Sequence, residues 1–376
     1  MRSIIYVSGT RADFGLMTST LKQMVDDPGL DVSVCVTGMH LSAKFGDTVK
    51  DIEESGIRVC GKIPVELEEA SGAAMAKSIG HELIGMVDLF TQEQPDLVLV
   101  LGDRGEQLAG ALAAIHLNIP VVHIHGGERS GTVDEPVRHA ISKLAHYHLV
   151  ATEGSRERLV RMGECEEHIF VTGAPGLDGL KETAQRSRQN LCDQYDLDAQ
   201  QPVALVLFHP VLQEAAEAAE QTRQLMDALK QDSLQKIVLM PNADAGGSAI
   251  RETLEGYRDQ PGVRLIVHLP RTDFISWLAQ ADVMVGNSSA GIIEAATFGL
   301  PVVNVGSRQA GRERSGNVVD VSQDSASIRK AVAQALKHGK LTVSNIYGDG
   351  QAGARIVEKI KQLDLGGELL KKSNTY

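Results

Sequence analysis

Aromatic residues and cysteines are scarce in this chain of 376 residues. Phe, Trp and Tyr make up 4% of the sequence, and its four cysteines include no Cys-x-x-Cys pair. Four scattered cysteines cannot form a disulfide framework in a chain this long, so we expect a reducing compartment and a cytoplasmic protein. The histidines include no His-Glu-x-x-His motif, which is one common sign of a zinc site.

Long apolar runs and an excess of basic residues are also missing. No window approaches the roughly 18 apolar residues that a membrane span requires, and the opening run at 1–7 is too short for a signal peptide. The chain has 37 Lys and Arg against 49 Asp and Glu, a formal charge of −12. Because an acidic surface repels polyanions, we expect neither nucleic acid nor an anionic membrane as a partner. A local cluster of arginines can still bind a small phosphorylated ligand.

Short apolar runs alternate with longer amphipathic stretches along the whole chain. We predict strands at residues 4–8, 32–37, 97–101, 121–125, 148–152, 169–171, 203–208, 237–240, 263–268, 283–285 and 301–305. The run 97–101 is apolar on both faces, as in parallel sheets that helices cover on both sides. The pattern weakens over the polar residues 181–201. We therefore predict an α/β protein with two doubly wound, Rossmann-like domains facing a cleft, at 1–180 and 190–357, and a C-terminal helix near 358–376 packing back on the first.

Ligands of doubly wound sheets bind at the carboxyl ends of the strands, so residues that follow the strands are the site candidates. The segment 9–13 (GTRAD) departs from the Gly-x-Gly-x-x-Gly fingerprint, and we predict no nicotinamide or other cofactor. Arg11 is expected at the mouth of the sheet; the alternative is a surface Arg beside a helix-capping Asp13. Asp103 alone favours another cap, but with Arg104 beside it the pair suits an anionic substrate.

The next strand runs into a glycine-rich loop with several ionisable groups. His123 and His125 share a strand face, where the alternatives are a metal pair and two hydrogen-bonding histidines. No third ligand stands at a recognisable spacing, so we predict no metal. Glu128 and Asp134 follow on the same loop. Several titratable groups beside a cleft favour proton transfer over the alternative of a merely solvated loop.

Polar residues also follow the strands of the second half. His209 and Asn242 come after two of them. The small-residue turn at Ser288 and Ser289 opens a helix, which favours an anion site over the alternative of an ordinary Ser N-cap. Glu294 lies further along that helix, placed to accept ribose hydroxyls. The cations expected near the phosphates follow the last predicted strand: Arg308, Arg312 and Arg314.

The order and spacing of these motifs resemble those of the hydrolysing UDP-N-acetylglucosamine 2-epimerase family over most of the chain. The matching segments are 9–13, 37–40, 102–104, 130–134, 138–144 and 286–289. The resemblance implies a glycosyltransferase-B-like fold, a UDP-sugar substrate and a homodimer or homotetramer. It implies that UDP leaves UDP-N-acetylglucosamine as the C2 proton is removed, and that water adds to the resulting 2-acetamidoglucal. N-acetylmannosamine and UDP would be released for sialic-acid-type sugar synthesis.

Carried over residue by residue, the resemblance assigns roles to individual positions. Asp103 and Asp134 match the family's catalytic carboxylates, and Arg104 stands beside the first of them. The positions that match UDP-binding residues are Arg11, His209, Asn242, Ser288, Ser289, Glu294 and Arg308.

Two positions depart from the family pattern. Many members carry a catalytic Glu where this chain has His125, whose imidazole can act as acid or base near neutrality; the alternative is that Glu128 takes over. This His variant resembles bacterial members that act on UDP-2,4-diacetamido-2,4,6-trideoxyglucose (UDP-diacetylbacillosamine) on the way to legionaminic acid, so that sugar is an alternative substrate. Leu16 falls where non-hydrolysing relatives carry Lys, which favours the hydrolysing branch. A glycosyltransferase of the same fold and a non-catalytic UDP-sugar sensor are the remaining alternatives.

Overall fold

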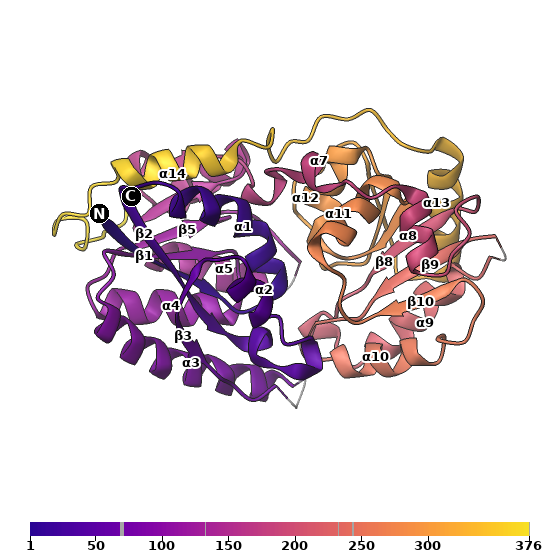
Figure 1. Cartoon of the computed structure of the whole chain (residues 1–376), viewed down its shortest axis with the longest axis horizontal. Helices are drawn as coiled ribbons and strands as arrows, with labels where there is room; N and C mark the ends of the chain where they lie inside the picture. The colour runs from indigo at the N-terminus through magenta and orange to yellow at the C-terminus, as the bar shows by residue number, and fades with distance from the viewer. Residues whose placement is uncertain (68–70, 132, 232, 243, 376) are drawn as a thin grey trace.

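Two separate parallel β-sheets form the two halves of the molecule (Figure 1). The computed structural model describes residues 1–375 apart from 68–70, 132, 232 and 243. Within them the first sheet has seven strands: β1 (Arg2–Ser8), β2 (Leu30–Thr37), β3 (Arg58–Ile63), β4 (Leu97–Leu101), β5 (Val121–Ile124), β6 (Tyr147–Val150) and β7 (Ile169–Val171). The second sheet, over the same described residues, has six: β8 (Val203–Leu207), β9 (Gln235–Leu239), β10 (Val263–Ile266), β11 (Val283–Gly286), β12 (Val302–Val305) and β13 (Val318–Val321). The predicted pair of α/β domains with parallel sheets is confirmed.

The strand order places a topological switch point in each sheet. The orders are β3-β2-β1-β4-β5-β6-β7 and β10-β9-β8-β11-β12-β13, so the direction of winding reverses between β1 and β4 and again between β8 and β11. The loops that leave these strands diverge to opposite faces, and a crevice forms outside their carboxyl ends. Arg11, Asp103, His209 and Ser288 all lie just after these four strands.

Helices cover both faces of both sheets (Figure 1). In chain order they are α1 (Arg11–Val25), α2 (Val49–Glu54), α3 (Gly72–Glu93), α4 (Gly105–His116), α5 (Asp134–Leu144), α6 (Glu153–Arg161), α7 (Leu180–Thr183), α8 (Arg188–Gln194), α9 (Ala218–Ala228), α10 (Gly247–Glu255), α11 (Arg271–Gln280), α12 (Ser289–Ile293), α13 (Ser325–His338) and α14 (Ala352–Gln362). Of the helices in the described residues, none combines the length and the apolar character that a membrane crossing requires.

The alternation of side chains along β1 explains why both faces need helices. Ile4 and Tyr6 belong to the core under α1 and α14, whereas Ile5 and Val7 belong to the core under α3 and α4. Successive strand residues point to opposite faces, so a strand that is apolar at every position must be buried on both sides.

The strands missing from the sequence prediction are β3 and β13, which lie at the edges of their sheets. Residues of both strands remain partly or fully exposed, and their sequences, RVCGKI and VVDV, mix polar with apolar residues. An edge strand pairs on one side and needs no continuous apolar run, which leaves its sequence signal weak.

The final helix returns from the second half to the first. α14 lies beside α1 (Figure 1), and its Ile356 and Ile360 are fully buried in the core of the first sheet. The sequence placed this helix near 358–376, but it spans Ala352–Gln362. Residues 363–375 form turns and extended chain, and Tyr376 lies outside the described residues.

Replacing Gly286 by Ala is expected to lower the free energy of unfolding by about 2–6 kcal/mol, because it adds backbone strain to a steric clash. Gly286 ends β11 with φ +136°, and a Cβ there would lie 1.9 Å from the carbonyl oxygen of Leu207 on β8. Urea denaturation measures the change.

Gly80→Ala is the matched control, because a Cβ at this position of α3 meets nothing within 4 Å. It should leave stability unchanged or raise it by up to about 1 kcal/mol. Equal effects of the two substitutions would contradict the assignment of strain to Gly286.

Candidate functional site

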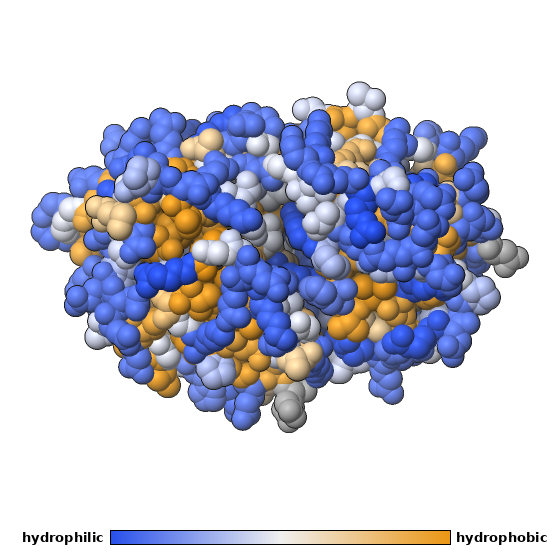
Figure 2. Space-filling model, viewed as in Figure 1, coloured by the Kyte–Doolittle hydropathy of each residue, from blue (hydrophilic) through white to orange (hydrophobic). Residues whose placement is uncertain are grey.

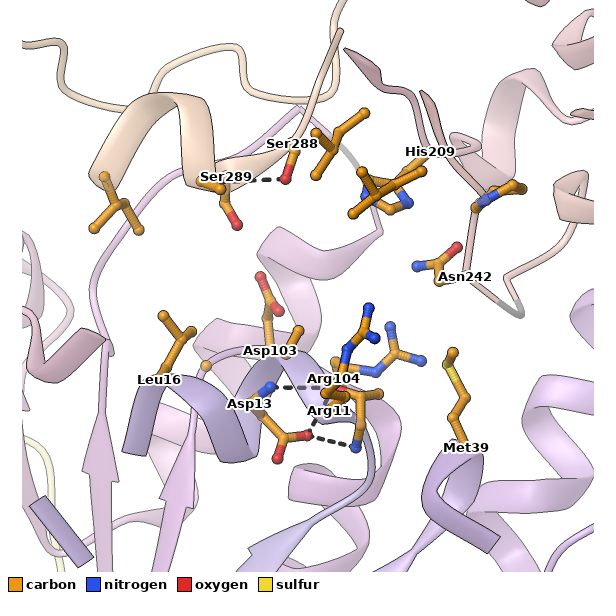
Figure 3. A pocket seen from close by; sticks show the side chains of 18 of the residues that line it. Arg11, Asp13, Leu16, Met39, Asp103, Arg104, His209, Asn242, Ser288 and Ser289 are labelled. Carbon is orange, nitrogen blue, oxygen red and sulfur yellow. Dashed lines mark hydrogen bonds between the residues drawn. The ribbon is translucent and has the colours of Figure 1, made fainter. Parts of the chain in front are cut away.

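A cavity of about 320 Å³ opens between the carboxyl ends of the two sheets, where the surface is hollowed between the halves (Figure 2). Pockets that hold small molecules commonly measure roughly 300–1,000 Å³. Most of the site residues predicted from the sequence line the cavity: Arg11, Asp103, Arg104, His125, Glu128, Asp134, His209, Asn242, Ser288, Ser289, Glu294, Arg308 and Arg312. Arg314, expected near the phosphates, is not among the lining residues, and its guanidinium lies 3.1 Å from Asp320 Oδ1 instead. Figure 3 shows side chains of the first half facing those of the second across this space.

Thr10 is the N-cap of helix α1, and Asp13 completes a capping box with it. Its carboxylate accepts the backbone N–H of Thr10 at 2.8 Å, while the Thr10 hydroxyl accepts the N–H of Asp13 at 3.2 Å. Burial raises the pKa of Asp13, and hydrogen bonds from Ser8 and Thr10 oppose that rise. The capping alternative is therefore confirmed for Asp13. The cap fixes Arg11 at the start of α1, where its guanidinium contacts the His268 ring of the second half.

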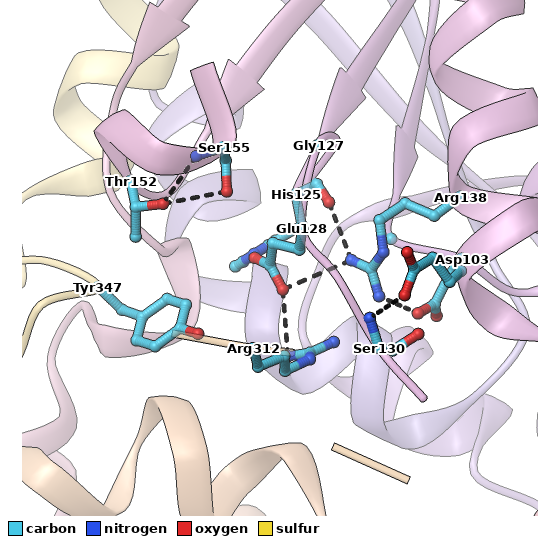
Figure 4. Close-up of polar contacts among 12 residues, drawn as sticks. Asp103, His125, Gly127, Glu128, Ser130, Arg138, Thr152, Ser155, Arg312 and Tyr347 are labelled. Carbon is cyan, nitrogen blue, oxygen red and sulfur yellow. Dashed lines mark hydrogen bonds and ion pairs between the residues drawn. The ribbon is translucent and has the colours of Figure 1, made fainter. Parts of the chain in front are cut away.

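A largely buried ion-pair network forms part of the cavity wall (Figure 4). The Arg138 side chain is 1% exposed, and its guanidinium pairs with the carboxylate of Asp103. It also donates to the carbonyl oxygen of His125 at 2.9 Å and lies 3.5 Å from Glu128 Oε2. The other carboxylate oxygen of Glu128 contacts Nδ1 of His125. One arginine thus connects three of the predicted catalytic residues.

The second half contributes Arg312 to this network. Arg312 Nη1 lies 3.1 Å from Glu128 Oε2, with 7% of the Arg312 side chain exposed. Burial alone would raise the pKa of Glu128, but the positive charges of Arg312, His125 and Arg138 lower it far below the usual range. Glu128 therefore stays ionised at neutral pH. The sequence assigned Arg312 to phosphate, whereas its guanidinium pairs with this carboxylate.

Arg104 bridges the two halves at the other side of the cavity. Its guanidinium lies 3.2 Å from Glu106 Oε1 at the start of α4 and 3.2 Å from Asp244 Oδ1 in the second half. Burial would lower the pKa of Arg104, but Glu106 and Asp244 raise it well above its ordinary value. Asp244 also accepts from the side-chain amide of Asn242 at 2.6 Å.

His209 is held at the end of β8 by its backbone. Its N–H donates to Asn287 Oδ1 at 2.7 Å, and its carbonyl oxygen accepts from Asn287 Nδ2 at 2.8 Å. Burial, with the nearby charge of Arg308, lowers the pKa of the His209 ring to about 3. The ring is therefore neutral and can donate or accept a hydrogen bond, but carries no positive charge toward a phosphate.

Ser288 and Ser289 lie at the turn from β11 into α12. Ser288 Oγ accepts the backbone N–H of Ala290 at 3.3 Å, so Ser288 is the N-cap of α12. An ordinary Ser N-cap was the alternative that the sequence left open beside an anion site. α12 is a short helix that continues as 3₁₀ turns, which weakens its dipole. Glu294 at its end pairs with Arg271 of α11 at 2.6 Å. Arg308 donates to the carbonyl oxygen of Asn287 at 3.1 Å.

The comparison with family models covers almost the whole chain. Residues 22–361 match the model described as UDP-N-acetylglucosamine 2-epimerase. The chain belongs to this epimerase family. The family resemblance inferred from the sequence motifs is thereby confirmed.

Individual 2-epimerases are also similar to this epimerase family member. The chain is 53% identical, over 100% of both chains, to a UDP-N,N'-diacetylbacillosamine 2-epimerase (hydrolyzing) of Legionella pneumophila. It is 34% identical to a UDP-N-acetylglucosamine 2-epimerase of Neisseria meningitidis, covering 93% of this chain and 92% of that one. A solved UDP-GlcNAc 2-epimerase from Neisseria meningitidis, bound to UDP-GlcNAc, superposes with a TM-score of 0.81 at 20% identity, over 96% of this chain and 100% of that one.

The His123 ring of this epimerase family member is buried and hydrogen-bonded on both nitrogens. Its ring nitrogens contact the Gly102 carbonyl oxygen at 2.7 Å and the Ser142 hydroxyl at 3.1 Å. Burial lowers the pKa of the ring well below its usual value. The hydrogen-bonding alternative therefore describes His123, and the described residues contain no cluster of three metal-ligating side chains.

The sequence did not predict the ion-pair partners of four residues of the site. They are Arg138, Asp244, Arg271 and Arg312. Arg138 stands one turn after Asp134 on α5, so helical spacing gave one signal that it lies near the catalytic loop. No comparable signal exists for the others, because each pairs with a residue of opposite charge that is remote in sequence.

Proposed function

We propose that the chain is a hydrolysing UDP-sugar 2-epimerase. The observation that carries this proposal is the cavity itself, where carboxylates and an imidazole of the first half face arginines and hydroxyls of the second. A base beside C2 and cations beside the leaving diphosphate are what an elimination of UDP requires. Water then adds to the 2-acetamidoglucal with inversion at C2, releasing a free sugar and UDP.

We further propose UDP-2,4-diacetamido-2,4,6-trideoxyglucose as the substrate, in preference to UDP-N-acetylglucosamine. The 53% identity to the Legionella enzyme, against 34% to the Neisseria one, supports this choice. The two sugars differ at C4, with acetamido for hydroxyl, and at C6, with methyl for hydroxymethyl. Leu16 and Met39 give the cavity apolar surface of a kind that suits the less polar sugar (Figure 3). The expected pathway is the legionaminic acid type.

For the proton transfers we propose Asp103, Asp134 and His125. Glu128 is strongly held as an anion by two arginines, which makes it a poor base for a weakly acidic C–H. Its contact with His125 instead suits it to orient the imidazole. Between the sequence alternatives, His125 is therefore the proposed acid or base and Glu128 its partner.

For UDP we propose cations and hydroxyls from both halves. Arg11, Arg104 and Arg308 are placed to neutralise the diphosphate, with Ser288 and Ser289 as hydrogen-bond donors. Glu294 is placed for the ribose hydroxyls, with its Oε1 already held by Arg271. His209 and Asn242 complete the nucleotide side of the cavity. A cytoplasmic location and a homodimer or homotetramer stay predictions.

Arg308→Gln is expected to weaken UDP binding about 10- to 100-fold, the loss of one or two charge-assisted hydrogen bonds. The Arg308 side chain is 15% exposed at the cavity, and its Nη2 lies 3.9 Å from Asp134. Calorimetric titration with UDP measures the change. Arg329→Gln, an exposed arginine on α13 remote from the cavity, should bind UDP like the wild type. An unchanged affinity of Arg308→Gln would remove Arg308 from the UDP site.

The function is tested with both UDP-sugars in deuterated water without any acceptor. We expect UDP release, deuterium at C2 of the freed sugar by NMR, and a kcat/KM about 10-fold or more in favour of the diacetamido sugar. A preference for UDP-N-acetylglucosamine would overturn the substrate but not the reaction. No UDP release without an acceptor would overturn the epimerase and leave the glycosyltransferase alternative.

A further inference from the structure

The segment 307–314, between β12 and β13, crosses from the second half to the catalytic loop of the first. The carbonyl oxygen of Arg308 accepts the backbone N–H of Gly131 at 3.1 Å. The Glu313 carboxylate accepts the Thr152 hydroxyl at 2.6 Å. A Cβ at Gly131 would lie 1.8 Å from the Ser307 carbonyl oxygen, so the two backbones are in direct contact here. The segment 307–314 is thus docked on the first half at Gly131 and at Thr152.

Arg308 and Arg312 on this segment have different surroundings. Arg308 lies against the turn after β11, where its Nη1 donates to the Asn287 carbonyl oxygen at 3.1 Å. Arg312 places its Nη1 3.1 Å from Glu128 Oε2 (Figure 4). The Arg308 guanidinium lies 3.9 Å from the Asp134 carboxylate, whereas the more buried Arg312 guanidinium lies 3.1 Å from Glu128.

The Glu128 carboxylate is divided between these partners. Oε1 contacts Nδ1 of His125, and Oε2 lies against Arg312 and Arg138. An imidazole whose Nδ1 is bound to a carboxylate has one ring orientation and presents Nε2 as its reactive nitrogen. His125 itself stands just after β5 with φ +62°, an uncommon backbone conformation for a residue other than glycine. The Glu128 carboxylate is hydrogen-bonded to Nδ1 of this ring.

We propose that Arg312 is a positioning residue for the reaction: from the second half of the chain it fixes Glu128, and through Glu128 it orients the imidazole of His125 toward the sugar. The inference rests on the proposed function. Because Arg308 and Arg312 share the segment 307–314, the segment that meets the diphosphate is the one that aligns the acid or base. Diphosphate binding and correct alignment of His125 are thereby linked through one docked segment.

Arg312→Gln tests this proposal. We expect kcat to fall about 100-fold, the lower end of what a positioned acid or base contributes, with KM and the Kd for UDP within about 3-fold of wild type. Arg312→Lys should recover part of kcat, because an ammonium keeps the charge without the planar fork. Arg129→Gln is the matched control, since Arg129 is 55% exposed on the neighbouring loop, and it should match wild type.

A double-mutant cycle separates positioning from a general structural effect. Glu128→Gln should lower kcat as much as Arg312→Gln does, and the double variant should be no worse than Glu128→Gln alone. Additive losses, or a loss of UDP affinity with kcat unchanged in Arg312→Gln, would overturn the proposal.

A spectroscopic readout makes the test independent of the substrate. The buried hydrogen bond between His125 Nδ1 and the Glu128 carboxylate should give a downfield proton resonance that is absent from His125→Asn and lost or broadened in Arg312→Gln. Its persistence in Arg312→Gln would overturn the proposal. Wild-type enzyme that releases no UDP from either sugar, but loses this resonance in Arg312→Gln, would overturn the proposed function while leaving Arg312 as the residue that orients His125.

Discussion

Asp134→Asn is expected to lower kcat by about 100- to 10,000-fold, the usual contribution of a positioned acid or base. Asp134 begins α5, lines the cavity and is 28% exposed on its side chain. Asn has the same shape but cannot take a proton, so the substitution removes the chemistry with little change in packing. UDP release and deuterium incorporation at C2 measure the loss.

Binding should survive this substitution. Asp134 lies 3.9 Å from Arg308 Nη2, and Asn keeps the size of the side chain while leaving the positive charge of Arg308 available to the diphosphate. We expect the Kd for UDP to stay within about 3-fold of wild type, a change of less than 1 kcal/mol. Glu153→Gln is the control, because Glu153 holds the first position of α6 and is 72% exposed. Near-normal turnover of Asp134→Asn would remove Asp134 from the reaction.

Arg138→Met should reduce both stability and activity. Breaking a buried ion pair by removing one partner leaves uncompensated charge and costs about 3–5 kcal/mol. Arg138 is 1% exposed and serves Asp103, Glu128 and the carbonyl oxygen of His125. The midpoint of urea denaturation should fall accordingly, and turnover should fall because Asp103 and His125 lose their alignment.

Two further variants identify the cause of that loss. Arg156→Met is the control, because Arg156 pairs with Glu153 and Glu166 at the surface and should change stability by less than about 1 kcal/mol. Adding Asp103→Asn to Arg138→Met should restore part of the stability, since it removes the negative charge that Arg138 pairs with. If the double variant is no more stable than Arg138→Met, packing rather than charge is the cause.

Local pattern predicted the interior of both sheets well and their edges poorly. β4 is apolar at all five positions and was predicted with its bounds. β3 and β13 were missed because an edge strand with exposed residues carries no such run. At α1 the alternatives left open by the sequence were resolved by contacts: Asp13 completes the capping box of the helix, and Arg11 reaches His268 across the cavity.

The site was predictable in its members but not in its pairings. Parallel strands carry their carboxyl ends to one edge of a sheet, so residues after the strands, such as Asp103 and Ser288, had to meet at a cleft. Which charge pairs with which is a different question. Arg312 was expected at phosphate and lies on Glu128, while Glu294 was expected at ribose and also holds Arg271.

The sequence by itself determined two parallel α/β sheets and the set of polar residues at their carboxyl edges, because hydrophobic periodicity and strand ends are local properties. Only the tertiary structure decided that Glu128 is a buried anion bound to His125 and to an arginine of the other half. The physical reason is that burial and pairing of a charge depend on how the two halves face each other. That arrangement is set by contacts such as Gly131 against Ser307, which no local pattern contains.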